Sequence, residues 1–275
     1  MGHPLPAAIR RLLDLIFPSF MSSLAFDIAL AAIGGLCLGS FLNVVAYRLP
    51  AGVSLVSPPS ACPGCGVAIR PYDNVPVLSW LALGGHCRAC DTSISPRYPL
   101  TEALTGALFA AVVIAKGASR GVWLDLVFVV ALVAITRIDL EHRIIPNRIV
   151  APLVVAALVL TVALTPHLLV QRLIAGGAAG GFLLVALLAY PKGMGMGDVK
   201  LAAAMGLVLG TSVVPALFIA LISGTVVGAG VMARRGVAKG RKTAIPFGPF
   251  LALGAVVAIF AGPAMVHAYL HGVGL

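Results

Sequence analysis

The sequence predicts an all-α polytopic membrane protein with about eight transmembrane helices and a small cytoplasmic four-cysteine zinc-binding domain. Composition alone already indicates a membrane protein. Hydrophobic residues make up 60% of the 275 positions and charged residues only 10%, whereas an ordinary soluble domain has about 25% charged residues. The apolar residues gather in long runs, and four of the five cysteines stand in the largest interval between those runs.

Each expected span is an apolar run that approaches the roughly 20 residues a helix needs to cross the hydrocarbon core. The runs are 24–47, 100–115, 122–138, 149–165, 172–190, 199–213, 215–232 and 248–270. Two of them, 100–115 and 199–213, are short, so we expect their ends to shift by several residues.

Basic residues accumulate in the cytoplasmic loops of membrane proteins, and in this chain they are distributed unequally. If the loop after the first span is cytoplasmic, fourteen of the 19 Lys and Arg residues lie on that side and five on the other. The cytoplasmic set is Arg48, Arg70, Arg88, Arg97, Arg137, Arg143, Arg148, Lys192, Lys200, Arg234, Arg235, Lys239, Arg241 and Lys242, and the opposite set is Arg10, Arg11, Lys116, Arg120 and Arg172. This asymmetry accounts for the net charge of +10, so we expect contact with membrane lipid and no nucleic-acid partner.

Two aspartates lie at the ends of apolar runs, where an ionised carboxylate is costly and usually functional. Asp139 closes the run 122–138, and Asp198 opens the run 199–213 after Gly195 and Gly197, which form a GxGD pattern with it. Glycines leave room for another backbone and permit angles denied to other residues. Because the chain crosses the membrane twice between the two acids, both are expected at the cytoplasmic boundary.

Close helix packing would hold the two acids in register, and the sequence contains pairs of glycines four residues apart that allow it. The pairs are Gly35 with Gly39, Gly176 with Gly180, Gly177 with Gly181, and Gly224 with Gly228.

A pair of adjacent carboxylates near low dielectric is expected to share a proton, because two full charges cannot both be held there cheaply. The ionised acid can take a proton from water while the protonated acid polarises a peptide carbonyl, as in aspartic proteases. Intramembrane Asp pairs also act as proton relays in transporters. On these two residues alone, a hydrolase and a proton-coupled transporter are equally open.

The interval 48–99 carries two CxxC pairs, Cys62 with Cys65 and Cys87 with Cys90, separated by 21 residues. Two such pairs are typical of a tetrahedral four-cysteine zinc site. Disulfides are the alternative, but reducing conditions disfavour them in the cytoplasm. With four thiolates as ligands no open position is left, so the metal would be structural. Cys37, inside the first span, is interpreted as a small packing residue.

Several specific motifs follow one another in a fixed order from about residue 35 to 255. They are the segments 39–50, 62–66, 72–80, 94–102, 138–140 with 145–146, 193–200 and 245–250. Together these segments resemble the bacterial type IV prepilin peptidases (prepilin leader peptidase/N-methyltransferase), which are GxGD aspartyl proteases.

The resemblance implies an inner-membrane peptidase in which Asp139 and Asp198 fall on the family's catalytic pair. Its substrates are precursors of type IV pilins or of the pseudopilins of type II secretion. They are cut on the cytoplasmic side, after a Gly that ends a short basic leader. Family members with the four-cysteine domain commonly also methylate the new N-terminus from S-adenosylmethionine. Because the cysteine set is intact, we expect this second activity; a peptidase without it is the nearest alternative.

The resemblance divides the chain into three parts. Residues 1–47 form the N-terminal segment and first span, 48–99 the cytoplasmic zinc-binding domain associated with methyl transfer, and 100–275 the transmembrane aspartyl peptidase domain. A transporter is disfavoured because the sequence shows no second GxGD copy, whereas transporters commonly contain internal repeats.

The sequence also suggests roles for Glu102 and Asn147. Glu102, at the cytoplasmic start of the second span, could contact the basic leader of a substrate by charge pairing or complement the dipole in a first helical turn. Asn147 stands where the family often has Asp, and since both residues cap helices well we interpret this position as structural.

Overall fold

The structure is a computed structural model that describes residues 24–117, 119, 121–191, 193–236 and 245–272. Part of the expected segment 1–47 therefore lies outside the described residues. So do seven of the basic residues counted above, namely Arg10, Arg11, Arg120, Lys192, Lys239, Arg241 and Lys242.

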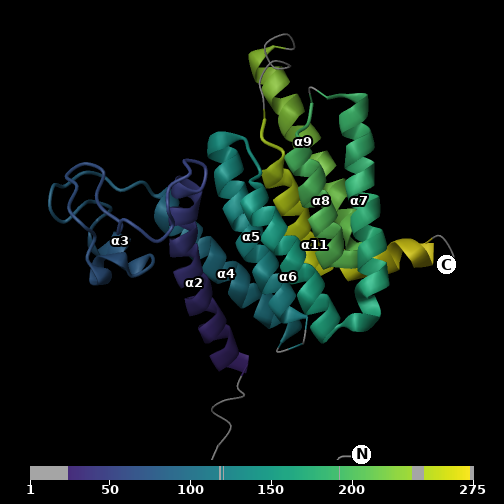
Figure 1. Cartoon of the computed structure of the whole chain (residues 1–275), viewed down its shortest axis with the longest axis horizontal. Helices are drawn as coiled ribbons and strands as arrows, with labels where there is room; N and C mark the ends of the chain where they lie inside the picture. The colour runs from purple at the N-terminus through teal and green to yellow at the C-terminus, as the bar shows by residue number, and fades with distance from the viewer. Residues whose placement is uncertain (1–23, 118, 120, 192, 237–244, 273–275) are drawn as a thin grey trace, which may run out of the picture.

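Across the described ranges, eight long helices form the body of the protein, one for each expected apolar run (Figure 1). They are α2 (Leu24–Arg48), α4 (Arg97–Lys116), α5 (Val122–His142), α6 (Asn147–Leu164), α7 (Leu169–Ala189), α8 (Met196–Leu209), α9 (Val213–Arg235) and α11 (Gly248–Gly272). The all-α class is confirmed. Several boundaries differ from the expected ones by three or four residues: α5, for example, continues to His142, whereas α8 ends at Leu209, before η4 (Gly210–Ser212).

Six candidate membrane spans meet the length and hydropathy that a crossing helix requires. Helix α5 is not among them because it carries Asp125, Arg137 and Asp139 within one span's length. Helices α8 and α9 are joined by the short 3-10 helix η4 (Gly210–Ser212) and count as one stretch of 40 residues, Met196–Arg235. The chain is thus a multi-pass helical membrane protein, and eight is an approximate number of spans.

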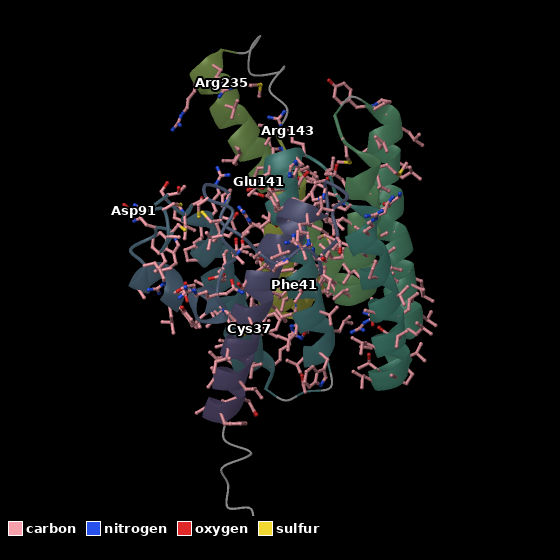
Figure 2. The ribbon with its side chains drawn as sticks, turned by 60° about the vertical axis from the view of Figure 1, so that its left-hand side comes forward. Cys37, Phe41, Asp91, Glu141, Arg143 and Arg235 are labelled. Atoms are coloured by element: carbon pink, nitrogen blue, oxygen red, sulfur yellow. The ribbon has the colours of Figure 1, made fainter. Side chains whose placement is uncertain are left out.

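The helices run alternately up and down, which brings distant parts of the chain to the same end. The Asn43 side chain of α2 donates to the Tyr98 carbonyl of α4 at 3.1 Å, and Arg97 pairs with Glu141 of α5 at 3.4 Å. Arg143 and Arg235 lie at that same end (Figure 2). We call the end marked by these arginines the basic end.

Glycines decide how closely the helices approach. A Cβ added to Gly39 would lie 2.7 Å from the Glu102 Cα of α4, and one added to Gly180 would lie 2.9 Å from the Ala203 Cβ of α8. The close packing predicted for these patterns is confirmed. At Gly177, Gly181 and Gly228 an added Cβ would meet nothing within 4 Å, so these members of the expected pairs do not serve packing.

The segment between α2 and α4 forms a small module beside the basic end (Figure 1). It contains the 3-10 helix η2 (Pro71–Asn74), the short helix α3 (Leu78–Ala82), and two isolated β-bridges, Ala61↔Ala68 and His86↔Ser93. Within residues 49–96, only Cys62, Ser79 and Gly85 are buried. So small a module has no hydrophobic core of its own and needs a cross-link or a metal to hold its loops.

Candidate functional site

Asp139 lies in the last turn of α5 and is buried, with 4% of its surface exposed. The backbone N–H of Gly248, the first residue of α11, donates to Asp139 Oδ2 at 2.9 Å. A Cβ added to Gly248 would lie 2.7 Å from the same oxygen. Glycine is therefore required at position 248 by the approach of a carboxylate, and α11 fixes the orientation of Asp139.

Asp198 is the third residue of α8 and is also buried, at 8% exposure. Its Oδ2 accepts the N–H of Gly195, the residue that caps this helix, at 3.0 Å. A negative charge at a helix N-terminus is stabilised by the free N–H groups and by the helix dipole. The turn that begins α8 thus orients Asp198 much as the start of α11 orients Asp139.

The two GxGD glycines serve different purposes. Gly195 has φ −98° and ψ 154°, an extended conformation open to any residue, so the wider range of angles that glycine permits is not used there. Gly197 is needed for close approach, because an added Cβ would lie 2.8 Å from the Ile145 Cβ. Ile145 follows α5, so this contact brings the start of α8 against the segment just after Asp139.

The structure brings the two aspartates together at the basic end. Helices α5 and α8 touch each other, and both touch α11. The two carboxylates are close enough to interact electrostatically. Since each carboxylate has its Oδ2 held by a backbone N–H, the Oδ1 atoms are the ones left for water or a bound peptide.

Glu141 and Lys200, two charged residues near the pair, have partners other than the aspartates. Glu141 forms ion pairs with Arg137 at 3.1 Å and Arg97 at 3.4 Å, and it does not join the aspartates. Lys200 donates to Asn147 Oδ1 at 3.0 Å. The capping interpretation of Asn147 was wrong: Pro146 occupies the cap position of α6, and the Asn147 side chain instead connects α6 to α8.

The four cysteines of the two CxxC pairs converge from both ends of the module. Their sulfur atoms all lie within 4.8 Å of one another, and the sulfurs of Cys62 and Cys90 are 3.7 Å apart. A tetrahedral metal with bonds of about 2.3 Å would separate its sulfur ligands by about 3.8 Å. The set therefore fits a metal ion and is far too wide for a disulfide, whose sulfurs are about 2.05 Å apart.

Hydrogen bonding prepares part of this set for metal binding. Bonds from the Thr92 side chain and backbone lower the pKa of Cys90 to about 6, which favours the thiolate that a metal requires. The Val67 amide acts in the same direction on Cys65, but the neighbouring sulfur of Cys90 raises the pKa of Cys65 to about 11. A cation among the four sulfurs would remove this conflict, because it stabilises every thiolate at once.

Two family models match the chain in sequence order. Residues 33–116 match the bacterial peptidase A24 N-terminal domain, and residues 126–230 match the type IV leader peptidase family. A prepilin leader peptidase/N-methyltransferase of Burkholderia pseudomallei (strain 1026b) is 37% identical over 269 residues, which cover 86% of each chain. The chain belongs to the type IV leader peptidase family.

Other relatives in the type IV leader peptidase family carry the same name. The protein of Pseudomonas aeruginosa is 34% identical over 276 residues, covering 87% of this chain and 92% of the relative. That of Neisseria gonorrhoeae is 38% identical over 259 residues, covering 82% and 87%. No solved structure matches the chain significantly.

Glu102 lies in the first turns of α4 and is buried, at 8% exposure. Its Oε2 accepts the N–H of Val77 in the cysteine module at 2.7 Å. Val77 has φ 62°, a conformation that is strained for a β-branched residue. The structure thus gives Glu102 a partner within the chain, at the junction between the module and the bundle.

Gly248 and Ile145 are the site residues for which sequence reasoning found no role. Both lie in segments that carry the resemblance to type IV leader peptidases, 245–250 and 145–146. Sequence alone could not say that one positions Asp139 and the other packs on Gly197, since these contacts join segments more than 50 residues apart.

Proposed function

We propose that this chain is an aspartyl endopeptidase that removes the basic leader from type IV prepilins or pseudopilins, with Asp139 and Asp198 as the catalytic pair. The observation that carries the proposal is a pair of buried carboxylates that interact electrostatically, each oriented by a backbone N–H, at one end of a membrane bundle. Membership of the type IV leader peptidase family supports the same conclusion.

The proposed reaction needs one water and one shared proton. The ionised aspartate takes a proton from water as the water oxygen attacks the peptide carbonyl carbon, and the protonated aspartate gives its proton to the carbonyl oxygen. The tetrahedral intermediate then collapses: the C–N bond breaks, and the aspartate that was protonated by water gives that proton to the leaving nitrogen. A hydroxyl group of the intermediate returns its proton to the other aspartate, so the pair again holds one proton. The hydrogen bond from Gly248 N–H holds Oδ2 of Asp139, and that from Gly195 N–H holds Oδ2 of Asp198. On this proposal Oδ1 of each acid faces the reacting atoms.

We also propose that the protein lies in the bacterial inner membrane with its basic end in the cytoplasm. The arginines of the basic end are on the side favoured for cytoplasmic loops, and the leader of a prepilin substrate would be cut on that side. A proton-coupled transporter is not favoured, because the relatives are named as peptidases.

A direct assay tests the function. Purified protein in detergent is incubated with a synthetic prepilin peptide and S-adenosylmethionine, and the products are weighed by mass spectrometry. We expect loss of the leader after Gly and a further 14 Da on the new N-terminus, about the mass of one CH₂ group. An intact peptide under conditions in which a relative cleaves it would contradict the peptidase assignment.

The metal of the cysteine module is proposed to be a structural zinc ion. Cys62, Cys65, Cys87 and Cys90 would hold it, and four thiolates are a typical closed zinc set. Since the module has almost no buried core, the ion would supply most of its folding energy.

Replacing Cys62 by Ser is expected to lower the zinc content of the purified protein from one ion per chain to background. The module should then become sensitive to protease, because the cluster of four sulfurs is the main link between its two knuckles. Elemental analysis and limited proteolysis check both results. The interpretation of Cys37 as a packing residue was wrong, since it is an exposed free cysteine on α2 (Figure 2). Cys37→Ser is therefore the matched control, and it should keep both zinc and protease resistance.

N-Methylation of the new N-terminus from S-adenosylmethionine is proposed from the names of the relatives and the intact four-cysteine set. The methyl donor supplies an electrophilic methyl group. On this proposal residues 48–99 are the zinc-binding domain associated with methyl transfer, 100–275 the peptidase domain, and 1–47 the N-terminal segment with the first span.

Glu102→Ala is expected to loosen the module from the bundle, because the Val77 N–H would lose its acceptor at a cost of about 1–3 kcal/mol. Hydrogen exchange at Val77 and around it should speed up. Glu102→Gln should behave as the unmodified protein, since an amide oxygen can accept the same bond. If Glu102 instead contacts the basic leader by charge, both variants will raise the KM for the prepilin equally and leave exchange unchanged.

A further inference from the structure

Two adjoining cavities lie at the end of the bundle opposite the aspartates. That they lie at the far end follows from α11: Gly248 at its start faces Asp139, whereas Gly262 faces Ser212 of η4, about 21 Å further along the helix. The larger cavity, about 810 Å³, is a groove between α7 and α9, and the smaller one, about 390 Å³, lies between the start of α7, η4 and α11.

The groove exists because α7 and α9 each pack closely on another helix. Helix α7 packs on α8 and α9 packs on α11, while α7 and α9 touch only briefly. Small residues of α7, among them Ala178, leave the space between them open, and large apolar residues form its walls. The wall residues are Val170, Ile174, Phe182, Val214, Phe218 and Leu221, all with substantial exposure on the bundle surface.

The groove ends in a polar mouth. The Gln171 side chain donates to the Thr211 hydroxyl at 3.4 Å, and these two residues line both cavities. Beyond them the smaller cavity holds Arg172 and His267. The apolar groove therefore adjoins a cavity that is lined in part by Arg172.

Arg172 and the charged groups that interact with it carry one positive charge more than they carry negative charges. Lys116 forms an ion pair with Asp125 at 2.6 Å. Arg172 interacts electrostatically with the same carboxylate and donates to the Thr161 hydroxyl at 2.6 Å. Within the described ranges, no carboxylate forms an ion pair with Arg172. Two cations thus share one aspartate, and the site favours an additional anion.

We propose that these cavities bind one anionic phospholipid, with an acyl chain in the groove between α7 and α9 and its phosphate beside Arg172. A phospholipid matches both parts, since a free anion would leave the apolar groove uncovered and a neutral lipid would leave the excess charge unmatched. The proposal does not depend on the peptidase function, because the cavities are at the other end of the bundle from the aspartates.

Native mass spectrometry of the full chain in detergent tests the proposal. Phosphatidylglycerol is expected to bind about fivefold more tightly than phosphatidylcholine, the size of effect that one cation near a lipid headgroup produces. Arg172→Gln should abolish this preference, and Arg172→Lys should keep it. Equal binding of the two lipids by the unmodified protein would overturn the assignment of the phosphate.

The groove is tested separately by filling it. Ala178→Phe places a ring in the groove from an exposed position on α7 and should reduce the retention of both lipids. Ala186→Phe, the same change at an exposed position of α7 outside the groove, is the matched control and should leave binding unchanged. Unchanged binding in Ala178→Phe, or tight binding of inorganic phosphate alone in place of lipid, would overturn the proposal.

Discussion

Asp139→Asn and Asp198→Asn are each expected to lower the rate of leader cleavage by about 10²–10⁴-fold, the range that general acid–base groups contribute. Asparagine cannot take a proton from water or donate one to a carbonyl oxygen. It still offers an oxygen to the N–H of Gly248 or Gly195, so the fold should persist. Single-turnover cleavage of a prepilin peptide, followed by mass spectrometry, measures the loss.

Glu141→Gln is the matched control for the aspartate variants. It removes a carboxylate from the same end of α5, but one that pairs with Arg137 and Arg97 rather than with the aspartates. Cleavage should change little, and thermal unfolding of all three variants should remain cooperative. Full activity in either aspartate variant would remove that residue from the proposed mechanism.

Gly248→Ala is expected to lower cleavage by about 10²-fold, because a displacement of about 1 Å in a catalytic group can cost that much. The added methyl would stand 2.7 Å from Asp139 Oδ2 and 3.1 Å from its Cγ. Either the carboxylate rotates away or the start of α11 moves, and both change the position of Oδ1. The effect should appear mainly in kcat, since the substrate-binding surface is left in place.

The control for Gly248→Ala is Gly228→Ala, since an alanine methyl at position 228 of α9 would meet nothing within 4 Å. Stability can be compared in the same pair of variants. Overpacking at position 248 should cost about 1–3 kcal/mol, whereas alanine at an open helical position should be neutral or slightly stabilising. Equal activity in both variants would show that Asp139 does not depend on Gly248.

Much of this architecture could be predicted from the sequence because long apolar runs have few structural solutions in a membrane. The all-α class, the order of the helices and the convergence of the four cysteines all follow from hydropathy and spacing. The common face of Asp139 and Asp198 also follows, from counting two crossings between them. Such features depend on hydropathy, on the spacing of motifs and on the number of crossings between them, all of which a single sequence displays.

Contacts between segments could not be predicted in the same way. Asn147 was interpreted as a helix cap because its residue type favours caps, but a lysine from α8 lies within reach and Pro146 already takes that position. For Glu102, charge alone suggested two roles. Its partner in the structure is the N–H of Val77, and a hydropathy pattern shows neither this hydrogen bond nor the strained conformation of Val77.

Helix α8 is short, and this affects how water reaches the catalytic pair. Its 14 residues extend about 21 Å, which is about 9 Å less than the hydrocarbon thickness of a bilayer. From Leu201 onward none of its residues is exposed, so neighbouring helices surround it and lipid does not. Gly195 and Met196 at its start are exposed, so water can reach the turn that holds Asp198, and hydrolysis consumes one water molecule for every peptide bond it breaks.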